Sequence, residues 1–131
     1  MKFGPVHPRP NTDPHPYDLS VCDQLISFAQ LHNMGVRGHA LVWHNQNPDW
    51  LTHGDFTPKQ LSAILQDHIT TVRKHLGANI YAYDVVNEAL DDDGKMHSTP
   101  WYDKPGVGLA GQGTKYIEQA LRWVHAASPS A

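Results

Sequence analysis

The sequence predicts an α/β fold with parallel strands, of the kind that forms part of a (β/α)8 TIM barrel. Two short and mostly apolar segments, residues 36–44 and 80–87, have the composition of buried parallel strands. Three segments in which apolar residues recur at helical spacing alternate with them. An order in which strands and helices alternate favours right-handed βαβ units and a parallel sheet.

The spacing of the two strands predicts how much of a barrel the chain represents. The strands begin at residues 36 and 80, so one unit occupies 44 residues, and 131 residues hold about three units. Eight such units would need roughly 350 residues, which is within the range of a (β/α)8 barrel. Two parallel strands alone would leave unpaired edges. We therefore expect about three of eight βα units of a larger barrel, and a small open α/β domain is the alternative.

The composition excludes several classes of protein. The 40% hydrophobic and 18% charged residues are typical of a soluble globular chain. A net charge of −3 argues against nucleic acid and against an anionic membrane as partners, because both require a basic surface. Cys22 is the only cysteine, which excludes an internal disulfide. No segment approaches the ~18 apolar residues of a membrane helix, and residues 1–20 lack the apolar stretch of a signal peptide.

The first part of the chain is predicted to be a loop followed by a helix. Residues 4–17 are expected to be an extended loop without helix, because each proline removes a backbone donor and restrains the residue before it. Asp18 is the expected N-cap of the helix, and Gly35 lies just past its end. The expected apolar stripe of this helix consists of Cys22, Leu25, Ile26 and Ala29.

A longer helix is predicted between the two strands. Thr57 and Pro58 form an N-cap followed by a proline in the first turn. Apolar residues from Leu61 to Leu76 hold helical spacing over about four turns, with His68 on the same stripe, and Gly77 ends the run.

The strand at residues 80–87 is followed by a predicted loop and a last helix. The loop spans residues 88–113 and is polar and rich in glycine. The helix is expected from about residue 114 to 127, with Ile117, Ala120, Leu121 and Val124 facing inward.

Polar residues cluster where the two predicted strands end. In a parallel barrel the working residues gather at the carboxyl ends of the strands. Trp43, His44 and Gln46 occupy that position after the first strand, and Asn87 and Glu88 after the second. A carboxylate that leaves an apolar strand is expected to be partly desolvated, which raises its pKa and suits a general acid. The alternative for Glu88 is an exposed loop residue.

Glutamate is scarce in this sequence. Only two of the thirteen acidic residues are Glu, at positions 88 and 118. Glu118 lies on a polar helix face beside Lys115, and Arg122 follows four residues later. This spacing favours a surface ion pair.

Ten histidines raise the possibility of a metal site, but their spacing does not support one. The sequence contains no His-x-His pair and no His-Glu-x-x-His motif. His39 and His44 have opposite parity and would point to opposite faces of a regular strand. We therefore predict no metal ligand.

Aromatic residues and one strand histidine are candidates for substrate contacts. His39 shares a face with Trp43, where an inward histidine of a barrel would meet a substrate, and a satisfied core residue is the alternative. Trp50 and Trp101 lie in loops at the same end. Their flat rings suit stacking on sugars and suit core packing equally well.

Two long motifs resemble a known family. The segments RGHALVWHNQNPDW (37–50) and YDVVNEALDDDG (83–94) resemble the third- and fourth-strand motifs of family-10 glycoside hydrolases, the endo-β-1,4-xylanases. Residues 1–10 resemble the end of the second-strand motif, and residues 99–131 resemble the segment that precedes the fifth strand. The resemblance implies that residues 1–131 are an internal fragment of a single (β/α)8 catalytic barrel, from the end of its second strand to just before its fifth.

The resemblance implies a retaining hydrolysis of internal β-1,4 bonds in xylan by two glutamates. Glu88 matches the acid/base and His44 its polar neighbour. Asn87 matches the residue that binds the 2-hydroxyl of the sugar being cleaved. The remaining implied substrate contacts are Lys2 and His39 to hydroxyls near the cleavage point, Trp43 as a ring lining that subsite, and Gln46 one sugar further out.

The implied nucleophile is a glutamate on the seventh strand, beyond residue 131, and Glu118 maps to a helix outside the barrel. We therefore expect this chain alone to be inactive. The resemblance implies xylan or xylo-oligosaccharides as partners, no cofactor and an extracellular location. A non-catalytic xylan-binding protein and a metal-dependent barrel hydrolase that uses the histidines are the alternatives.

Overall fold

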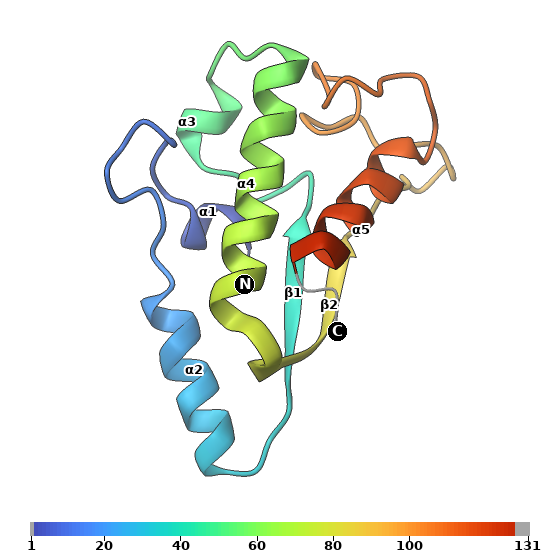
Figure 1. The fold of residues 1–131 in the computed structure, drawn as a ribbon. Coiled ribbons are helices and arrows are strands. Elements are labelled where there is room, and N and C mark those ends of the chain that lie inside the picture. The colour runs from blue at the N-terminus through green and yellow to red at the C-terminus, as the bar shows by residue number, and fades with distance from the viewer. Residues whose placement is uncertain (1, 128–131) are drawn as a thin grey trace.

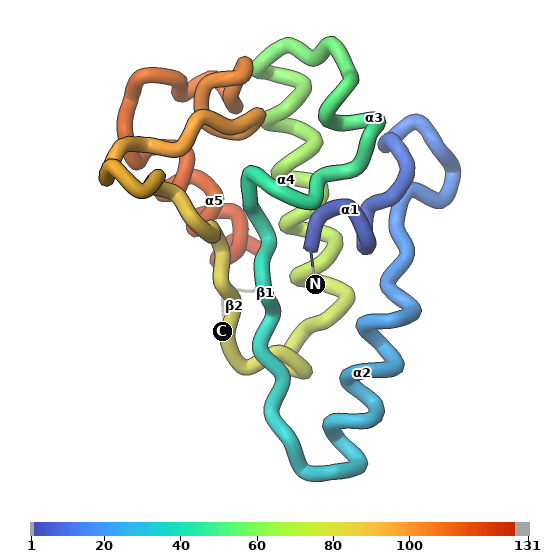
Figure 2. Tube along the Cα trace, turned by 180° about the vertical axis from the view of Figure 1, so that it is seen from behind, coloured from blue at the N-terminus to red at the C-terminus, as the bar shows by residue number. Residues whose placement is uncertain are grey.

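A two-stranded parallel sheet organises residues 2–127, which are the residues that the computed structural model describes. The sheet consists of β1 (Val36–Val42) and β2 (Ile80–Val86). The helices α4 (Pro58–Leu76) and α5 (Lys115–Ala127) lie on one side of it (Figure 1). Seen from behind, both strands lie in front of α4 and α5, and no helix of the described residues crosses over them (Figure 2). The predicted alternation is confirmed, and one face of the sheet is open.

The connecting helix α4 forms as its sequence predicts. Thr57 and Gln60 form a capping box, in which the Gln60 N–H donates to Thr57 Oγ1 at 3.3 Å and the Thr57 N–H donates to Gln60 Oε1 at 2.9 Å. Gly77 ends the helix with a φ of 53°, a left-handed value that glycine adopts without steric cost. The one-turn helix η1 (Gly77–Asn79) then leads into β2. The predicted stripe is buried, and it consists of Leu61, Ile64, Leu65, His68, Ile69, Val72 and Leu76.

The helix α2 (Ser20–Leu31) begins one residue later than predicted. Its N-cap is Leu19, while the Asp18 carboxylate accepts hydrogen bonds from the backbone N–H and the hydroxyl of Ser20 at 3.1 and 2.6 Å. Ile26 is buried, but Leu25 is 60% exposed, contrary to the prediction. The helix runs beside the sheet rather than across it, so only a narrow part of the stripe meets the core (Figure 1).

The prediction that residues 4–17 contain no helix is wrong for their first turn. α1 (Phe3–Val6) contains Pro5 at its third position, where the missing N–H would have no acceptor inside the helix. Phe3 and Val6 are buried and hold the turn against the core. A second one-turn helix, α3 (Asp49–Thr52), lies in the loop after β1.

The two strands differ from the prediction in extent and coverage. β1 ends at Val42, and its register shifts, since His39 pairs with Asp84 and Val42 with Val86. The extra residue in β1 is a bulge that interrupts the alternation of faces, and residues 40–42 are all at most 2% exposed. In β2 only Ile80 is buried. The prediction that both faces of the strand are covered is therefore wrong for β2, because the described residues cover only its α4–α5 side.

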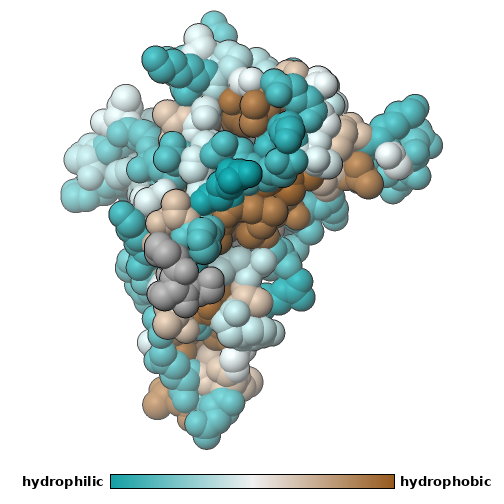
Figure 3. All heavy atoms as spheres, turned by 45° about the vertical axis from the view of Figure 1, so that its right-hand side comes forward, coloured by the Kyte–Doolittle hydropathy of each residue, from teal (hydrophilic) through white to brown (hydrophobic). Residues whose placement is uncertain are grey.

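The helix α5 packs through fewer residues than predicted. Tyr116 and Ala120 are buried, Ile117 and Val124 are partly buried, and Leu121 is 50% exposed. The view that brings this side forward shows apolar surface in the middle of the face (Figure 3). No helix within residues 2–127 is long and apolar enough to cross a membrane.

Candidate active site

The carboxyl ends of the two strands meet at one edge of the sheet and bring the predicted site residues together. The Asn87 N–H donates to the Val42 carbonyl at 2.9 Å, which continues the pairing by one step beyond β2. This bond sets Trp43 and His44, which follow β1, beside Glu88. The rule that parallel strands place polar residues at their carboxyl ends therefore holds here.

Glu88 is held by a single strong contact. The Trp43 indole N–H donates to Glu88 Oε2 at 2.7 Å, and His44 Nδ1 lies 3.8 Å from the same oxygen. The Glu88 backbone has a φ of 49°, a left-handed conformation that non-glycine residues rarely adopt and that is enriched at functional sites. The side chain is 54% exposed, so the desolvation expected from the apolar strand is only partial in this chain.

Lys2 and His39 adjoin the same tryptophan. Lys2 Nζ lies 5.0 Å from the centroid of the Trp43 ring, within range of a cation–π interaction. The His39 ring lies 6.3 Å from the Trp43 ring. Trp43 and His44 therefore adjoin Glu88 directly, whereas Lys2 and His39 adjoin the Trp43 ring.

Asp84 is a site residue that the sequence analysis missed. Its carboxylate accepts hydrogen bonds from the Arg37 guanidinium and, at 2.9 Å, from His39 Nδ1. These two bonds, that to Arg37 being the larger influence, hold the pKa of Asp84 below its usual value. The signal was available, because Asp84 is the one charged residue in an otherwise apolar strand, and the register places it opposite His39.

His97 is a second residue that the sequence analysis missed. Its ring stacks on His44 at 3.9 Å with an interplanar angle of 17°, and its backbone N–H donates to the Ala89 carbonyl. Burial and the neighbouring His97 lower the pKa of His44, and the Glu88 charge opposes them. These rings border a hollow of about 360 Å³ whose lining is His44, Glu88, Leu90, Asp91, Asp92 and His97. No local pattern marks His97, which reaches the site through a long loop.

Gln46 and Asn87 adjoin the cluster through their backbones. Gln46 is exposed, with a φ of 55°, and its carbonyl accepts the Gly4 N–H at 2.9 Å. A Cβ atom at Gly4 would lie 2.7 Å from that carbonyl oxygen, so glycine is needed for the approach of α1. Asn87 is partly buried. The described contacts do not join the side chain of either residue to Glu88.

Of the two loop tryptophans, Trp101 bonds a site residue and Trp50 does not. Trp101 is 1% exposed and its indole N–H donates to the Trp43 carbonyl at 2.9 Å, so its interpretation as a sugar platform is wrong. Trp50 is partly buried and donates to the His7 carbonyl at 3.2 Å. Buried indoles are found with such acceptors because their N–H must be satisfied.

The described residues also bear on the metal hypothesis and on the second glutamate. Within residues 2–127, no group of three or more His, Cys, Asp or Glu is placed to hold a metal ion.

Glu118 lies on α5 and pairs with Lys115 at 3.2 Å, as expected, and within residues 2–127 no ion pair joins Glu118 to Arg122.

The model of glycosyl hydrolase family 10 matches residues 1–131, the whole chain. The chain belongs to glycosyl hydrolase family 10. Among its family-10 relatives, a β-1,4-xylanase of Dictyoglomus thermophilum is 40% identical over 133 residues, covering 100% of this chain and 34% of that protein. Endo-1,4-beta-xylanase B of Thermotoga neapolitana is 38% identical, covering 100% of this chain and 35% of that protein.

Solved structures agree with this membership. The crystal structure of xylanase 10B from Thermotoga petrophila in complex with xylobiose is 38% identical and has a TM-score of 0.86. The match covers 100% of this chain and 37% of that chain. The chain therefore spans about a third of the length of these two relatives and of this solved chain.

Proposed function

We propose that this chain is part of an endo-β-1,4-xylanase and carries its acid/base residue, Glu88. The observation that supports the proposal most is the Trp43–Glu88 contact of 2.7 Å at the carboxyl ends of two parallel strands. The xylanase names of relatives that are 38–40% identical support the same reaction. In this proposal the chain is a segment of a (β/α)8 barrel, from the end of its second strand to just before its fifth, and the open face of the sheet is the barrel interior.

The contact with Trp43 favours Oε1 as the Glu88 oxygen that acts. An indole N–H is a donor only, so Oε2 must accept and cannot carry the catalytic proton toward Trp43. We assign the proton of the acid form to Oε1, which donates it to the glycosidic oxygen as the bond to the leaving sugar breaks and the second carboxylate of the reaction bonds the anomeric carbon. The same oxygen then removes a proton from water in the second half of a retaining reaction.

Neighbouring side chains offer contacts to sugar hydroxyls. An ionised Asp84 can only accept, so its bond to His39 Nδ1 assigns the proton of the neutral ring to that nitrogen and leaves Nε2 of the neutral ring as an acceptor for a hydroxyl. Lys2 is a donor beside the Trp43 face. Asn87 is assigned to the 2-hydroxyl of the sugar being cleaved and Gln46 to the next sugar, both on the family resemblance alone.

The second carboxylate of the reaction is proposed to come from a later strand of a longer protein. A retaining glycosidase needs two carboxyl groups about 5–5.5 Å apart. Glu118 is unsuited, because it lies on α5 in an ion pair with Lys115. Xylan or xylo-oligosaccharides would be the substrates, and an extracellular location would give access to them.

The proposal is tested by reducing-sugar release from xylan. We expect a longer protein that contains this chain to hydrolyse xylan, Glu88→Gln to remove nearly all of that activity, and Glu118→Gln to leave it unchanged. The 131-residue chain should release no sugar. Activity that survives Glu88→Gln would contradict the acid/base assignment, and activity lost in a chelator would favour the metal-dependent alternative.

A further inference from the structure

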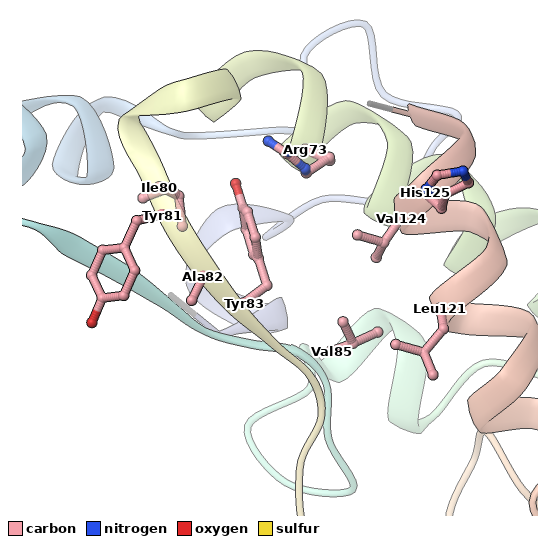
Figure 4. Close-up of a pocket in the computed structure, with 9 residues that line it drawn as sticks. All are labelled: Arg73, Ile80, Tyr81, Ala82, Tyr83, Val85, Leu121, Val124 and His125. Carbon is pink, nitrogen blue, oxygen red and sulfur yellow. The ribbon is translucent and has the colours of Figure 1, made fainter. Parts of the chain in front are cut away.

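A second polar pocket lies on the α4–α5 side of β2, away from Glu88. It has a volume of about 250 Å³ and lies between β2, α4 and α5. Figure 4 shows Arg73 of α4 and Tyr83 of β2 on one side of it, and Leu121 and Val124 of α5 on the other. None of the residues assigned above to the xylanase site lines it.

Arg73 is a buried cation with few partners. Its side chain is 4% exposed, and Nη1 donates to the Gly77 carbonyl at 2.7 Å. Its guanidinium lies 5.1 Å from the centroid of the Tyr83 ring. Within residues 2–127, no carboxylate forms an ion pair with Arg73. A guanidinium carries five donors, and a buried charge without a counter-charge is unfavourable, so Arg73 can still take an anionic partner.

The hydroxyl of Tyr83 is a second polar group that lies near the guanidinium. It is buried without a hydrogen-bond partner among the described residues, although buried hydroxyls are nearly always bonded. Figure 4 shows it directed to the side where Arg73 lies. Burial raises the pKa of Tyr83, and the neighbouring Arg73 guanidinium opposes the rise without cancelling it, so the hydroxyl stays protonated and able to donate.

We propose that this Arg73 pocket binds a carboxylate group carried on a short aliphatic stem. The Arg73 fork matches the two oxygens of a carboxylate, and the Tyr83 hydroxyl adds a third donor. The walls formed by Val85, Leu121 and Val124 suit an aliphatic stem. The carboxylate comes either from a free short-chain acid or from an acidic side chain of a longer protein, lying along the free edge of β2.

The test is a titration with sodium propionate, followed by the ¹⁵N–¹H signal of the Arg73 Nε–H group in the 131-residue chain. Sodium chloride at equal ionic strength and propionamide are the matched controls. We expect a saturable shift with propionate alone. Tyr83→Phe should weaken the affinity about tenfold, which corresponds to about 1.4 kcal/mol. Arg122→Met, which removes an exposed cation of α5, should leave the affinity unchanged.

The same titration on a longer protein that contains the chain distinguishes a free short-chain acid from an acidic side chain of the longer protein as the source of the carboxylate. A shift in both proteins identifies a free acid, and a shift in the short chain alone identifies an acidic side chain. If the short chain does not fold, unfolding of the longer protein decides, because Arg73→Met should then lower its stability or its propionate affinity relative to Arg122→Met. The proposal is overturned if propionate acts on the folded short chain no differently from chloride. Where only the longer protein folds, it is overturned if Arg73→Met and Arg122→Met have the same effect on stability and on propionate affinity.

Discussion

The strands β1 and β2 are similar in apolar character but differ in their surroundings. VRGHALV of β1 and IYAYDVV of β2 are both mostly apolar, yet residues 40–42 of β1 are at most 2% exposed, whereas β2 has a single buried residue, Ile80. α1 and α4 pack against β1, and α5 packs against β2. Apolar composition therefore predicts that a strand can be buried, whereas the segments that pack against the strand determine how many of its residues are buried.

The largest expected effect concerns two histidines on the α1–α4 side of the core. His7 and His68 are 0% and 1% exposed, and their four ring nitrogens lack hydrogen-bond partners among the described residues. Burial lowers the pKa of His7 to about 4, and it lowers that of His68 well below 6.5. The unfolded chain therefore binds more protons than the folded one, so stability is full above about pH 6.5 and falls as the pH falls toward 4.

This pH effect is measured by urea unfolding between pH 7.5 and 4. For His7 alone the 2.5-unit depression corresponds to a loss of about 3 kcal/mol. His68→Phe should reduce the pH dependence, leaving the part that is due to His7, whereas His75→Gln, which alters an exposed histidine of α4, should not reduce it. A pH dependence that His68→Phe leaves intact would contradict the assignment to these two rings.

The next effect uses a matched pair of valines. Val42 of β1 and Val86 of β2 are register partners, but Val42 is 1% exposed and Val86 is only partly buried. Val42→Ala should lower the free energy of unfolding by about 2 kcal/mol, and Val86→Ala by about 1 kcal/mol or less. Equal losses in denaturant unfolding of the 131-residue chain would break the contrast between the strands.

The smallest effect concerns the ion pairs that join the strands on the open face. Asp84 of β2 bonds Arg37 and His39 of β1, and all three side chains are at least partly exposed to solvent. Its lowered pKa means that the contribution is present above the usual carboxyl pKa and is lost as the pH falls through the folded value. Asp84→Asn should change stability at pH 7 no more than Glu118→Gln does, because exposed pairs contribute little. In a xylanase that contains the chain, Asp84→Asn should still reduce activity through His39.

Local sequence predicted the elements, since α4 has a complete stripe from Leu61 to Leu76 between Thr57 and Gly77. It also predicted the edge where Trp43 meets Glu88, because strand direction alone fixes that edge. It could not predict the buried role of Trp101, which depends on how a long loop folds back onto Trp43.

Local sequence also failed to predict which side chains face the core. The β1 bulge changes the alternation after His39, and Leu25 and Leu121 lie at the margins of α2 and α5 contacts. Such features depend on register and on neighbouring segments. The spacing of apolar residues along one segment carries no information about either.

The most direct test of the central claim, that Glu88 is the acid/base, is the dependence of Glu88→Ala on the leaving group. In a longer protein that contains the chain, the variant should lose about 10²–10⁴-fold in xylan hydrolysis. It should keep a rapid first-turnover burst of dinitrophenol from a dinitrophenyl xylobioside, because that leaving group departs without a proton. An equal loss of the burst and of xylan hydrolysis, or no loss of either, would contradict the account.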